Sequence, residues 1–348
     1  MSKAPIKAAI LSFGMSGRVF QAPFLSVNPN FILHGCWERS TKKIQTLYPA
    51  TISYHTYEAL LADNEVELVI VNTPNVTHFN FAKQALLAGK HVVIEKPFAV
   101  TTAECLELIE LAKSLNLKLS VFQNRRYDSD YLTVKEVVDQ NIIGKVVEAE
   151  LHFDRFSDKL NIKAHKEVPV KGVGLTYDLG SHLIDQALQL FGMPSAVFAD
   201  LRTLRPMGQV DDYLEILLYY TDLRVRIKAT LYARETQGYI FHGTKGSFFK
   251  PKTNIQEEAL SIGTLPIGED WSKEQEKDWG VLHTEIDGLI VRKKIPSVQG
   301  NYMRYFEGIY NAIRHGEPPT VLPEESMNVI KIIEAAIESN EKGHICKL

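Results

Sequence analysis

The chain has 348 residues, of which 45% are hydrophobic and 23% are charged, as in ordinary soluble globular proteins, and this length favours two domains. A formal net charge of −3 argues against nucleic-acid and anionic-membrane partners, and no apolar run is long enough to span a bilayer. Three scattered cysteines without CxxC spacing favour reduced thiols and a cytoplasmic location. No metal site is expected.

The first predicted strand, residues 6–13, runs into the sequence SFGMSG at Ser12 to Gly17. This sequence follows the G-x-G-x-x-G pattern of dinucleotide-binding turns, with serine in place of the first glycine. Gly14 would let the backbone approach a pyrophosphate, and Gly17 would let the next helix pack closely on the strand. The pattern alone is weak, because pairs of glycines also occur in ordinary turns.

A second predicted strand, residues 31–37, is followed by Glu38. An acidic residue about 20 residues beyond such glycines binds the ribose 2′-hydroxyl of NAD and repels the 2′-phosphate of NADP. The basic residues Arg39, Lys42 and Lys43 come directly afterwards and would favour that phosphate, unless these charges only form a solvated helix start. On balance the sequence favours NAD over NADP.

The alternation of strand and helix then continues. A strand over residues 67–71 ends in the polar sequence at 72–75, and a helix is expected from about 77 to 88. His78 lies in the first turn of that helix. A single histidine there is more often a hydrogen-bonded helix-start residue than a catalyst.

The stretch around Lys96 organises the first half of the chain. Residues 92–94 are apolar and β-branched, which predicts a buried parallel strand, and Pro97 ends it in an extended conformation. Thr101 and Glu104 form a capping box for the next helix. Because open α/β sheets bind ligands at the carboxyl ends of their strands, we expect Lys96 to meet a substrate beside a nicotinamide.

A strand over residues 117–122 closes the first predicted domain, residues 1–122, as an α/β doubly wound parallel sheet. The second predicted domain, residues 123–348, contains apolar–polar alternation, which indicates an antiparallel sheet with one solvated face. Its expected strands are residues 146–155, 196–204, 213–220, 224–232 and 238–249. Its expected helices are residues 175–191, 302–315 and 324–340, and residues 253–300 show no clear element.

The helix over 175–191 carries a second set of polar residues. Asp178, His182 and Asp185 fall at i, i+4 and i+7, so Asp178 can orient His182, the commonest kind of general acid or base. The alternative is an Asp/His pair that only satisfies its own hydrogen bonds. Two features favour chemistry, namely a glycine-rich entry and an adjacent hydroxyl: Gly172–Val173–Gly174 and Tyr177.

These segments resemble a known family. SFGMSG, NTPNVTH, AGKHVVIEKPFAVT, GxGLTYDLGSHLIDQ and HGTKGSF are similar to the Gfo/Idh/MocA oxidoreductases, and NRRYDSDYLT and LFGMP are similar to the scyllo-inositol dehydrogenase-like branch. The resemblance covers essentially the whole chain. It implies a Rossmann domain, a C-terminal α+β domain with a large open, mostly antiparallel sheet, and a homo-oligomer (dimer or tetramer) formed through that sheet. It also implies reversible NAD- or NADP-dependent oxidation of a hydroxyl on a sugar or cyclitol.

The resemblance also assigns residues. Lys96, Asp178 and His182 match the catalytic set, and the Lys96–Pro97 bond is expected to be cis. The positions that match the cofactor site are Ser12, Phe13, Gly14, Met15, Ser16, Gly17, Glu38, Arg39, Thr73, Pro74, Asn75, His78, Glu95, Lys96 and Asn124. The positions expected in the substrate pocket are Lys96, Arg126, Tyr127, Tyr177, Asp178, His182 and Asp185.

Three residues depart from the family pattern: Ser12 in the glycine turn, Val173 in a run that is often all glycine, and His165 where relatives often carry Trp or Arg. Two other functions stay open on this scaffold. An NAD-using glycoside hydrolase would show no net turnover of NAD(P). A non-catalytic sensor of sugars or dinucleotides would not need the Lys96, Asp178 and His182 set, which is intact here.

Overall fold

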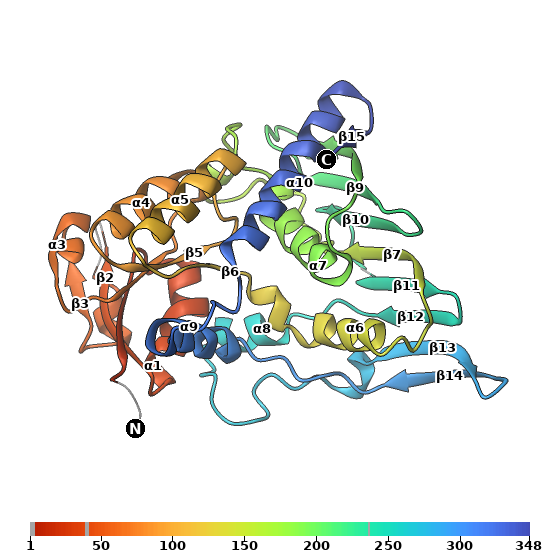
Figure 1. Cartoon of the computed structure of the whole chain (residues 1–348), viewed down its shortest axis with the longest axis horizontal. Helices are drawn as coiled ribbons and strands as arrows, with labels where there is room; N and C mark the ends of the chain where they lie inside the picture. The colour runs from red at the N-terminus through yellow and green to blue at the C-terminus, as the bar shows by residue number, and fades with distance from the viewer. Residues whose placement is uncertain (1–3, 39–41, 236) are drawn as a thin grey trace. The chain divides into compact units, whose positions relative to one another are not determined.

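The computed structural model describes residues 4–38, 42–235 and 237–348, which form two compact units (Figure 1). The sequence predicts a single domain boundary, after residue 122. In the structure the first unit also includes two later segments of the chain. The first unit comprises Met1–Asn124, Ile255–Ser272 and Asn301–Met327. The second unit comprises Arg125–Asn254, Lys273–Gly300 and Asn328–Leu348.

The first unit contains a six-stranded, fully parallel sheet in the order β3-β2-β1-β4-β5-β6. The order reverses between β1 and β4, which is where a doubly wound sheet opens a ligand crevice at the carboxyl ends of its strands. The predicted Rossmann fold is thus confirmed. The strands are β1 (Ile6–Ile10), β2 (Phe31–Trp37), β3 (Ile52–Tyr54), β4 (Leu68–Val71), β5 (His91–Glu95) and β6 (Leu119–Phe122).

Helices flank this sheet, and α4 lies beside α5 (Figure 1). The predicted capping box at the start of α5 is confirmed, because the Thr101 hydroxyl accepts the Glu104 N–H and the Glu104 carboxylate accepts the Thr101 N–H, each at 3.2 Å. The helices are η1 (Gly17–Gln21), α1 (Ala22–Val27), α2 (Ile44–Leu47), α3 (Tyr57–Ala62), η2 (Asn75–Thr77), α4 (His78–Leu87), α5 (Thr102–Ser114), α8 (Ile255–Ser261) and α9 (Met303–His315).

The later segments complete the core of the first unit. Helix α9, drawn in blue, lies beside α1, drawn in red (Figure 1). Phe306 of α9 stacks on Phe24 of α1, with ring centres 5.2 Å apart, and Tyr305 meets Phe122 of β6 edge-on at 4.9 Å. These rings are buried, so the returning helix supplies hydrophobic contacts that the first 124 residues lack by themselves.

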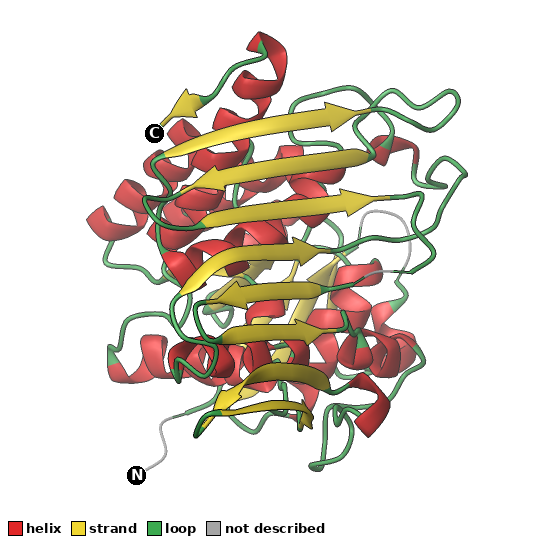
Figure 2. Ribbon diagram, turned by 90° about the vertical axis from the view of Figure 1, so that its right-hand side faces the viewer, coloured by secondary structure: helices red, strands yellow, loops and turns green. Residues whose placement is uncertain are grey.

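The second unit contains a nine-stranded sheet in the order β14-β13-β12-β11-β7-β10-β9-β8-β15, shown on its broad face in Figure 2. Only the β7–β10 pair is parallel, so the mostly antiparallel sheet is confirmed. The strands are β7 (Val146–His152), β8 (Ala196–Arg202), β9 (Tyr213–Tyr219), β10 (Arg224–Thr230), β11 (Tyr239–Gly243), β12 (Gly246–Lys250), β13 (Gly280–Ile286), β14 (Leu289–Ile295) and β15 (Cys346–Lys347).

Side chains alternate across this sheet as expected. In β9, Leu214, Ile216 and Leu218 are buried on one face, while Glu215 and Tyr219 lie partly exposed on the other. In the part of the chain that the structure describes, no helix covers the face seen in Figure 2. The other elements of this unit are α6 (Ser129–Asp139), η4 (Ala164–Lys166), η5 (Thr176–Gly180), α7 (Ser181–Phe191), η6 (Glu276–Asp278) and most of α10 (Pro323–Lys342); η3 (Asn124–Tyr127) spans the unit boundary.

Four sequence predictions need correction. The first strand ends at Ile10 rather than at residue 13, because the chain turns at the glycine sequence. The stretch 238–249 is a hairpin, β11 and β12, and not one strand. Residues 253–300 contain α8, β13 and β14. The helix over 175–191 begins as a π-helical turn, η5, before α7.

His152 lies at the end of β7 between two carboxylates, with Glu150 at 2.9 Å and Asp154 at 3.3 Å. Burial disfavours the imidazolium, but the two carboxylates outweigh burial and raise the pKa of His152 above 6.5. The charged ring therefore stabilises the fold below about pH 6.5, and this contribution is lost as the pH rises through the raised pKa. We expect His152→Gln to lower the free energy of unfolding more at pH 6 than at pH 9, measured by urea titration.

His242→Gln is the control, because the His242 ring bonds the Ser247 hydroxyl at 2.8 Å instead of a carboxylate. An equal loss at both pH values in His152→Gln would contradict the assignment.

In the described part of the chain, none of the helices combines the length and the apolar character that a membrane span requires. Cys36, Cys105 and Cys346 are buried and form no disulfide.

Candidate active site

The glycine turn follows β1 in the first unit. The Ser12 hydroxyl accepts the Gly14 N–H at 3.1 Å, so the serine that replaces the first glycine closes the turn through its own side chain. Asn72, at the end of β4, accepts the Leu11 N–H at 3.0 Å and donates to the Ser12 carbonyl at 2.7 Å. A side chain on Gly17 would begin 2.0 Å from that carbonyl, so only glycine allows η1 to approach the turn.

Glu95 links this turn to the end of β5. Its Oε1 accepts hydrogen bonds from the Ser16 hydroxyl and, at 2.8 Å, from the Gln21 side-chain amide. Burial raises the pKa of Glu95, although both hydrogen bonds favour the carboxylate. Through these hydrogen bonds, Glu95 connects the glycine turn to the end of β5, the strand that precedes Lys96.

His78 holds two loops at the same edge of the sheet. It is the first residue of α4, as expected, and its buried ring lies between the Pro97 carbonyl, 2.8 Å from Nδ1, and the Thr73 carbonyl, 2.9 Å from Nε2. Burial lowers the pKa of His78, although both carbonyls favour the protonated ring. The Lys96–Pro97 bond is cis, as the family resemblance implied. His78 thus fixes the backbone that directs Lys96.

Glu38 directly follows β2, at the position where an acidic residue is expected to bind the ribose of the cofactor. Its two carboxylate oxygens accept the N–H groups of Lys43 at 2.9 Å and Ile44 at 3.1 Å, so Glu38 also caps the short helix α2. The alternative prediction, that the charged residues from Glu38 to Lys43 form the start of a helix, is therefore correct for Glu38. Arg39 lies outside the described residues.

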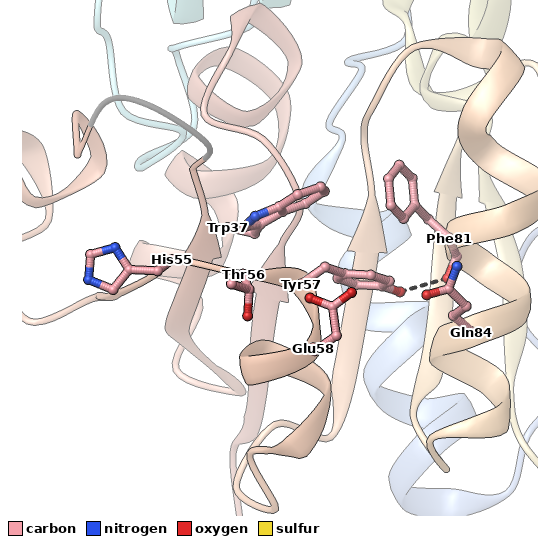
Figure 3. Close-up of a pocket in the computed structure, with 7 residues that line it drawn as sticks. All are labelled: Trp37, His55, Thr56, Tyr57, Glu58, Phe81 and Gln84. Carbon is pink, nitrogen blue, oxygen red and sulfur yellow. Dashed lines mark hydrogen bonds between the residues drawn. The ribbon is translucent and has the colours of Figure 1, made fainter.

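A cavity of about 360 Å³ opens at the ends of β2 and β3, where Trp37 and His55 line it (Figure 3). Three rings form its apolar wall, and the Tyr57 hydroxyl donates to the Phe81 carbonyl at 2.6 Å. None of the predicted site residues lines it. The lining residues are Trp37, His55, Thr56, Tyr57, Glu58, Phe81 and Gln84.

These features fit a dinucleotide. Gly14 is exposed, and only the Ser12 hydroxyl lies within 4 Å of the position where a side chain on Gly14 would begin, so the turn leaves room for a phosphate at the start of a helix. The other predicted cofactor residues of this unit also follow strand ends: Phe13 and Met15 in the glycine turn, Thr73, Pro74 and Asn75 after β4, and Asn124 after β6.

The second unit carries the other predicted catalytic residues on η5 and α7. Asp178 lies in the π-helical turn and is half-buried, whereas His182 is buried at the start of α7, with its ring centre 6.3 Å from that of Phe153. Single π-helical turns are frequent at functional sites. The other π-helical turn, η1, follows the predicted pyrophosphate turn.

The glycine-rich segment before η5 packs closely against Asp211. Gly174 has φ +113°, and a side chain there would begin 1.9 Å from an oxygen of Asp211. Asp211 accepts the Thr176 N–H and the Thr176 hydroxyl, each at 2.7 Å. Burial raises the pKa of Asp211, against these hydrogen bonds. Asp211 therefore anchors the turn that carries Asp178.

Arg126 and Asp185, both predicted in the substrate pocket, bind each other. Arg126 donates from Nε to one carboxylate oxygen of Asp185 at 2.7 Å and from Nη2 to the other at 2.6 Å. Their side chains are 9% and 3% exposed, so the pair is a buried bidentate clamp between η3 and α7. Tyr127 and Tyr177 are also buried. The clamp indicates that Arg126 and Asp185 position the helix that carries His182.

Sequence reasoning missed Lys166, which donates to Asp178 at 3.0 Å. The sequence instead pointed to the preceding residue, His165, whose side chain is exposed. Partial burial and the nearby Lys163 and Lys166 lower the pKa of His165. The excess of lysines over residues 159–171 was the available signal, but it does not say which lysine faces the helix.

A Rossmann sheet with an open glycine turn and a lysine at its carboxyl edge defines the class of nicotinamide-dinucleotide oxidoreductases. The NAD-binding Rossmann-fold domain of the oxidoreductase family GFO_IDH_MocA matches residues 6–123, and the C-terminal alpha/beta domain of that family matches residues 135–348. The chain therefore belongs to the Gfo/Idh/MocA oxidoreductase family and is a dehydrogenase or reductase.

Individual relatives agree with this assignment. The scyllo-inositol 2-dehydrogenase (NADP(+)) IolW of Bacillus subtilis is 34% identical, with 97% of this chain and 94% of that protein covered, and the oxidoreductase YdgJ of Escherichia coli is 39% identical, with 96% of each covered. A crystal structure described as an oxidoreductase from Bacteroides fragilis is 44% identical, with a TM-score of 0.90 over 99% of this chain and 100% of that chain.

Proposed function

We propose that this protein reversibly oxidises a hydroxyl of a sugar or a cyclitol, with NAD or NADP as the hydride carrier. The observation that carries the proposal is the presence of Lys96, Asp178 and His182 in a chain similar over nearly its whole length to an enzyme named for scyllo-inositol. A relative from Haloferax volcanii, 25% identical over 85% of each chain, is named a D-xylose 1-dehydrogenase, which supports the same substrate class.

In this mechanism the bound nicotinamide supplies the hydride chemistry. The neutral His182 imidazole accepts the proton of the reacting hydroxyl on a ring nitrogen. Asp178 orients the imidazole and favours its charged form after proton transfer. The Lys96 ammonium donates a hydrogen bond to the same oxygen and stabilises the negative charge that develops there. The cofactor would be held by the glycine turn, by Glu38 and by the loop after β4.

The test is a substrate panel. The panel contains scyllo-inositol, myo-inositol, D-xylose, D-glucose and the methyl glycosides of the two sugars, each with NAD and with NADP, monitored by absorbance of the reduced nicotinamide. Net formation of reduced nicotinamide with at least one polyol is expected. Release of methanol from a glycoside without net reduction would instead identify an NAD-using glycoside hydrolase. Tight binding of polyol and dinucleotide without any turnover would identify a sensor.

NAD is proposed as the preferred cofactor because of the Glu38 carboxylate, although IolW is named for NADP(+). Glu38→Gln removes the negative charge and keeps an oxygen for one of the two N–H groups at the start of α2. We expect the ratio of kcat/KM with NADP to kcat/KM with NAD to rise at least about tenfold, because like charges disfavour binding by several kcal/mol.

Glu58→Gln, which removes another carboxylate at the same end of the sheet, is the matched control and should leave that ratio unchanged. A ratio that stays the same in Glu38→Gln would remove Glu38 from the cofactor site.

A cytoplasmic location and a homo-oligomer, either a dimer or a tetramer, are also proposed. The three buried cysteines, none of which forms a disulfide, support a reducing compartment. The uncovered sheet face supports self-association, because Phe198 and Phe249 on it are 38% and 37% exposed. Light scattering coupled to size-exclusion chromatography should give a mass at least twice that of the 39.3 kDa chain. A monomer would contradict this.

A further inference from the structure

We propose that Lys166 is a substrate-binding residue which, together with Asp178, recognises two neighbouring hydroxyls of the substrate. This inference deepens the proposed function and rests on it. Its basis is the ion pair between the Lys166 ammonium and a carboxylate oxygen of Asp178, 3.0 Å apart in the second unit.

The ion pair is open to a ligand. Each of its two side chains is 41% exposed, whereas the neighbouring His182 side chain is buried. An exposed ion pair contributes little to folding stability, since water screens it and both side chains lose conformational freedom. A polar ligand can therefore bind alongside the two groups at low cost and form hydrogen bonds with both.

The loop that carries Lys166 is nevertheless fixed. Glu167, the next residue, receives a bidentate pair of hydrogen bonds from Arg205, at 3.0 and 3.1 Å, and Arg205 in turn donates to the buried Asp212 at 2.8 Å. Arg205 also donates to the Lys159 carbonyl at 3.0 Å. A buried charge network therefore holds this irregular loop in place.

Two consecutive carboxylates set the geometry of the pair. Asp211 anchors η5, which carries Asp178, through both hydrogen bonds to Thr176. Asp212 anchors Arg205 and, through Glu167, the loop of Lys166. Asp211 and Asp212 are consecutive residues immediately before β9. The same short segment therefore fixes both the turn of Asp178 and the loop of Lys166.

The chemistry of the pair indicates its ligand. An ammonium only donates hydrogen bonds and a carboxylate only accepts them, whereas a hydroxyl does both. Of two neighbouring hydroxyls, one can donate to Asp178 while the other accepts from Lys166. Their oxygens are separated by about the same distance as the two charged atoms here. The pair is also neutral overall, so it suits an uncharged polyol better than an isolated alcohol or a polyanion.

The experiment compares Lys166→Met with Lys171→Met in the complete protein. Lys171 is the matched control because it lies in the same loop and forms an exposed ion pair of the same length, 3.0 Å, with Glu334. Steady-state kinetics use the compound among scyllo-inositol, myo-inositol, D-xylose and D-glucose that the wild-type protein oxidises fastest. All four carry neighbouring hydroxyls.

Lys166→Met should raise KM for that compound about 10–100-fold, the effect of losing a hydrogen bond to a charged group, and leave kcat within about threefold. Lys166→Arg should recover most of the loss, since it keeps the charge and the donors. Lys171→Met should change neither parameter. A thermal unfolding midpoint close to that of the wild type verifies that the Lys166 variants fold.

An unchanged KM in Lys166→Met, or a fall in kcat alone, would overturn the inference while leaving the proposed function intact. A similar rise of KM in Lys171→Met would also overturn it, because a general loss of positive charge would then be the cause. If the wild-type protein oxidises none of the four compounds, the proposed function fails and this inference fails with it.

Discussion

Replacing His182 or Lys96 with alanine should each lower kcat/KM for polyol oxidation by about 10²–10⁴-fold, the usual range for general acid–base help. His182→Ala removes the group that accepts the hydroxyl proton, and Lys96→Ala removes the cation beside the same oxygen. Steady-state kinetics on the best compound of the panel measure both losses. The dissociation constants of NADH and NADPH, measured by the fluorescence of the reduced nicotinamide on binding, should change much less for His182→Ala.

The double variant provides the sharper measurement. If His182 and Lys96 act on one substrate oxygen, the loss in the double variant should be well below the product of the two single losses, because each group loses its function once the other is absent. His165→Ala is the control, since the exposed His165 is not required in this mechanism. Near-native kcat/KM in both single variants would refute the assignment.

Asp185→Asn should lower the free energy of unfolding by about 3–5 kcal/mol. The reason is that the buried Arg126 side chain, only 9% exposed, would lose the carboxylate that binds it through two hydrogen bonds. Urea titration measures the loss. Asp139→Asn is the matched control, because Asp139 pairs with Lys135 at 2.6 Å on an exposed helix surface and should contribute about 1 kcal/mol or less.

Replacing both members of the clamp separates charge imbalance from packing. Arg126→Met combined with Asp185→Leu should recover much of the stability lost in Asp185→Asn, since apolar groups of similar size can replace a buried ion pair. The double variant should still show reduced kcat, because the hydrogen bonds that fix the helix under His182 are gone. A single variant as stable as the wild type would mean that Arg126 finds another partner.

The elements that the sequence predicted well are those with a strong local signal. The apolar run of β5, its end just before Lys96 and Pro97, and the capping box at Thr101 and Glu104 depend on neighbouring residues only, and all three are confirmed. The strand β2 was placed to the residue for the same reason. Strand β14 was missed because it is an edge strand with mostly exposed side chains, so it carries no apolar–polar alternation.

The sequence could predict only part of the site, because several of its side chains are positioned by residues far away in the chain. The clamp joins Arg126 to Asp185, which are 59 residues apart, and no local pattern indicates that these two charges neutralise each other. Lys166 was missed because its direction depends on Glu167 binding Arg205, 38 residues away. For Glu38 the sequence left two roles open, cofactor binding and a helix start, because the four-residue helix that it caps has too weak a signal to be predicted.

The aromatic contacts of α9 with α1 and β6 limit how this protein can be recombined with its relatives. A chimera that exchanged only residues 1–122 would join Phe24 and Phe122 from one parent to Phe306 from the other, and these rings are all buried. A transplant of the cofactor-binding half must therefore carry the helix around Phe306 with it. Shuffling experiments at a single crossover point are the wrong design for this scaffold.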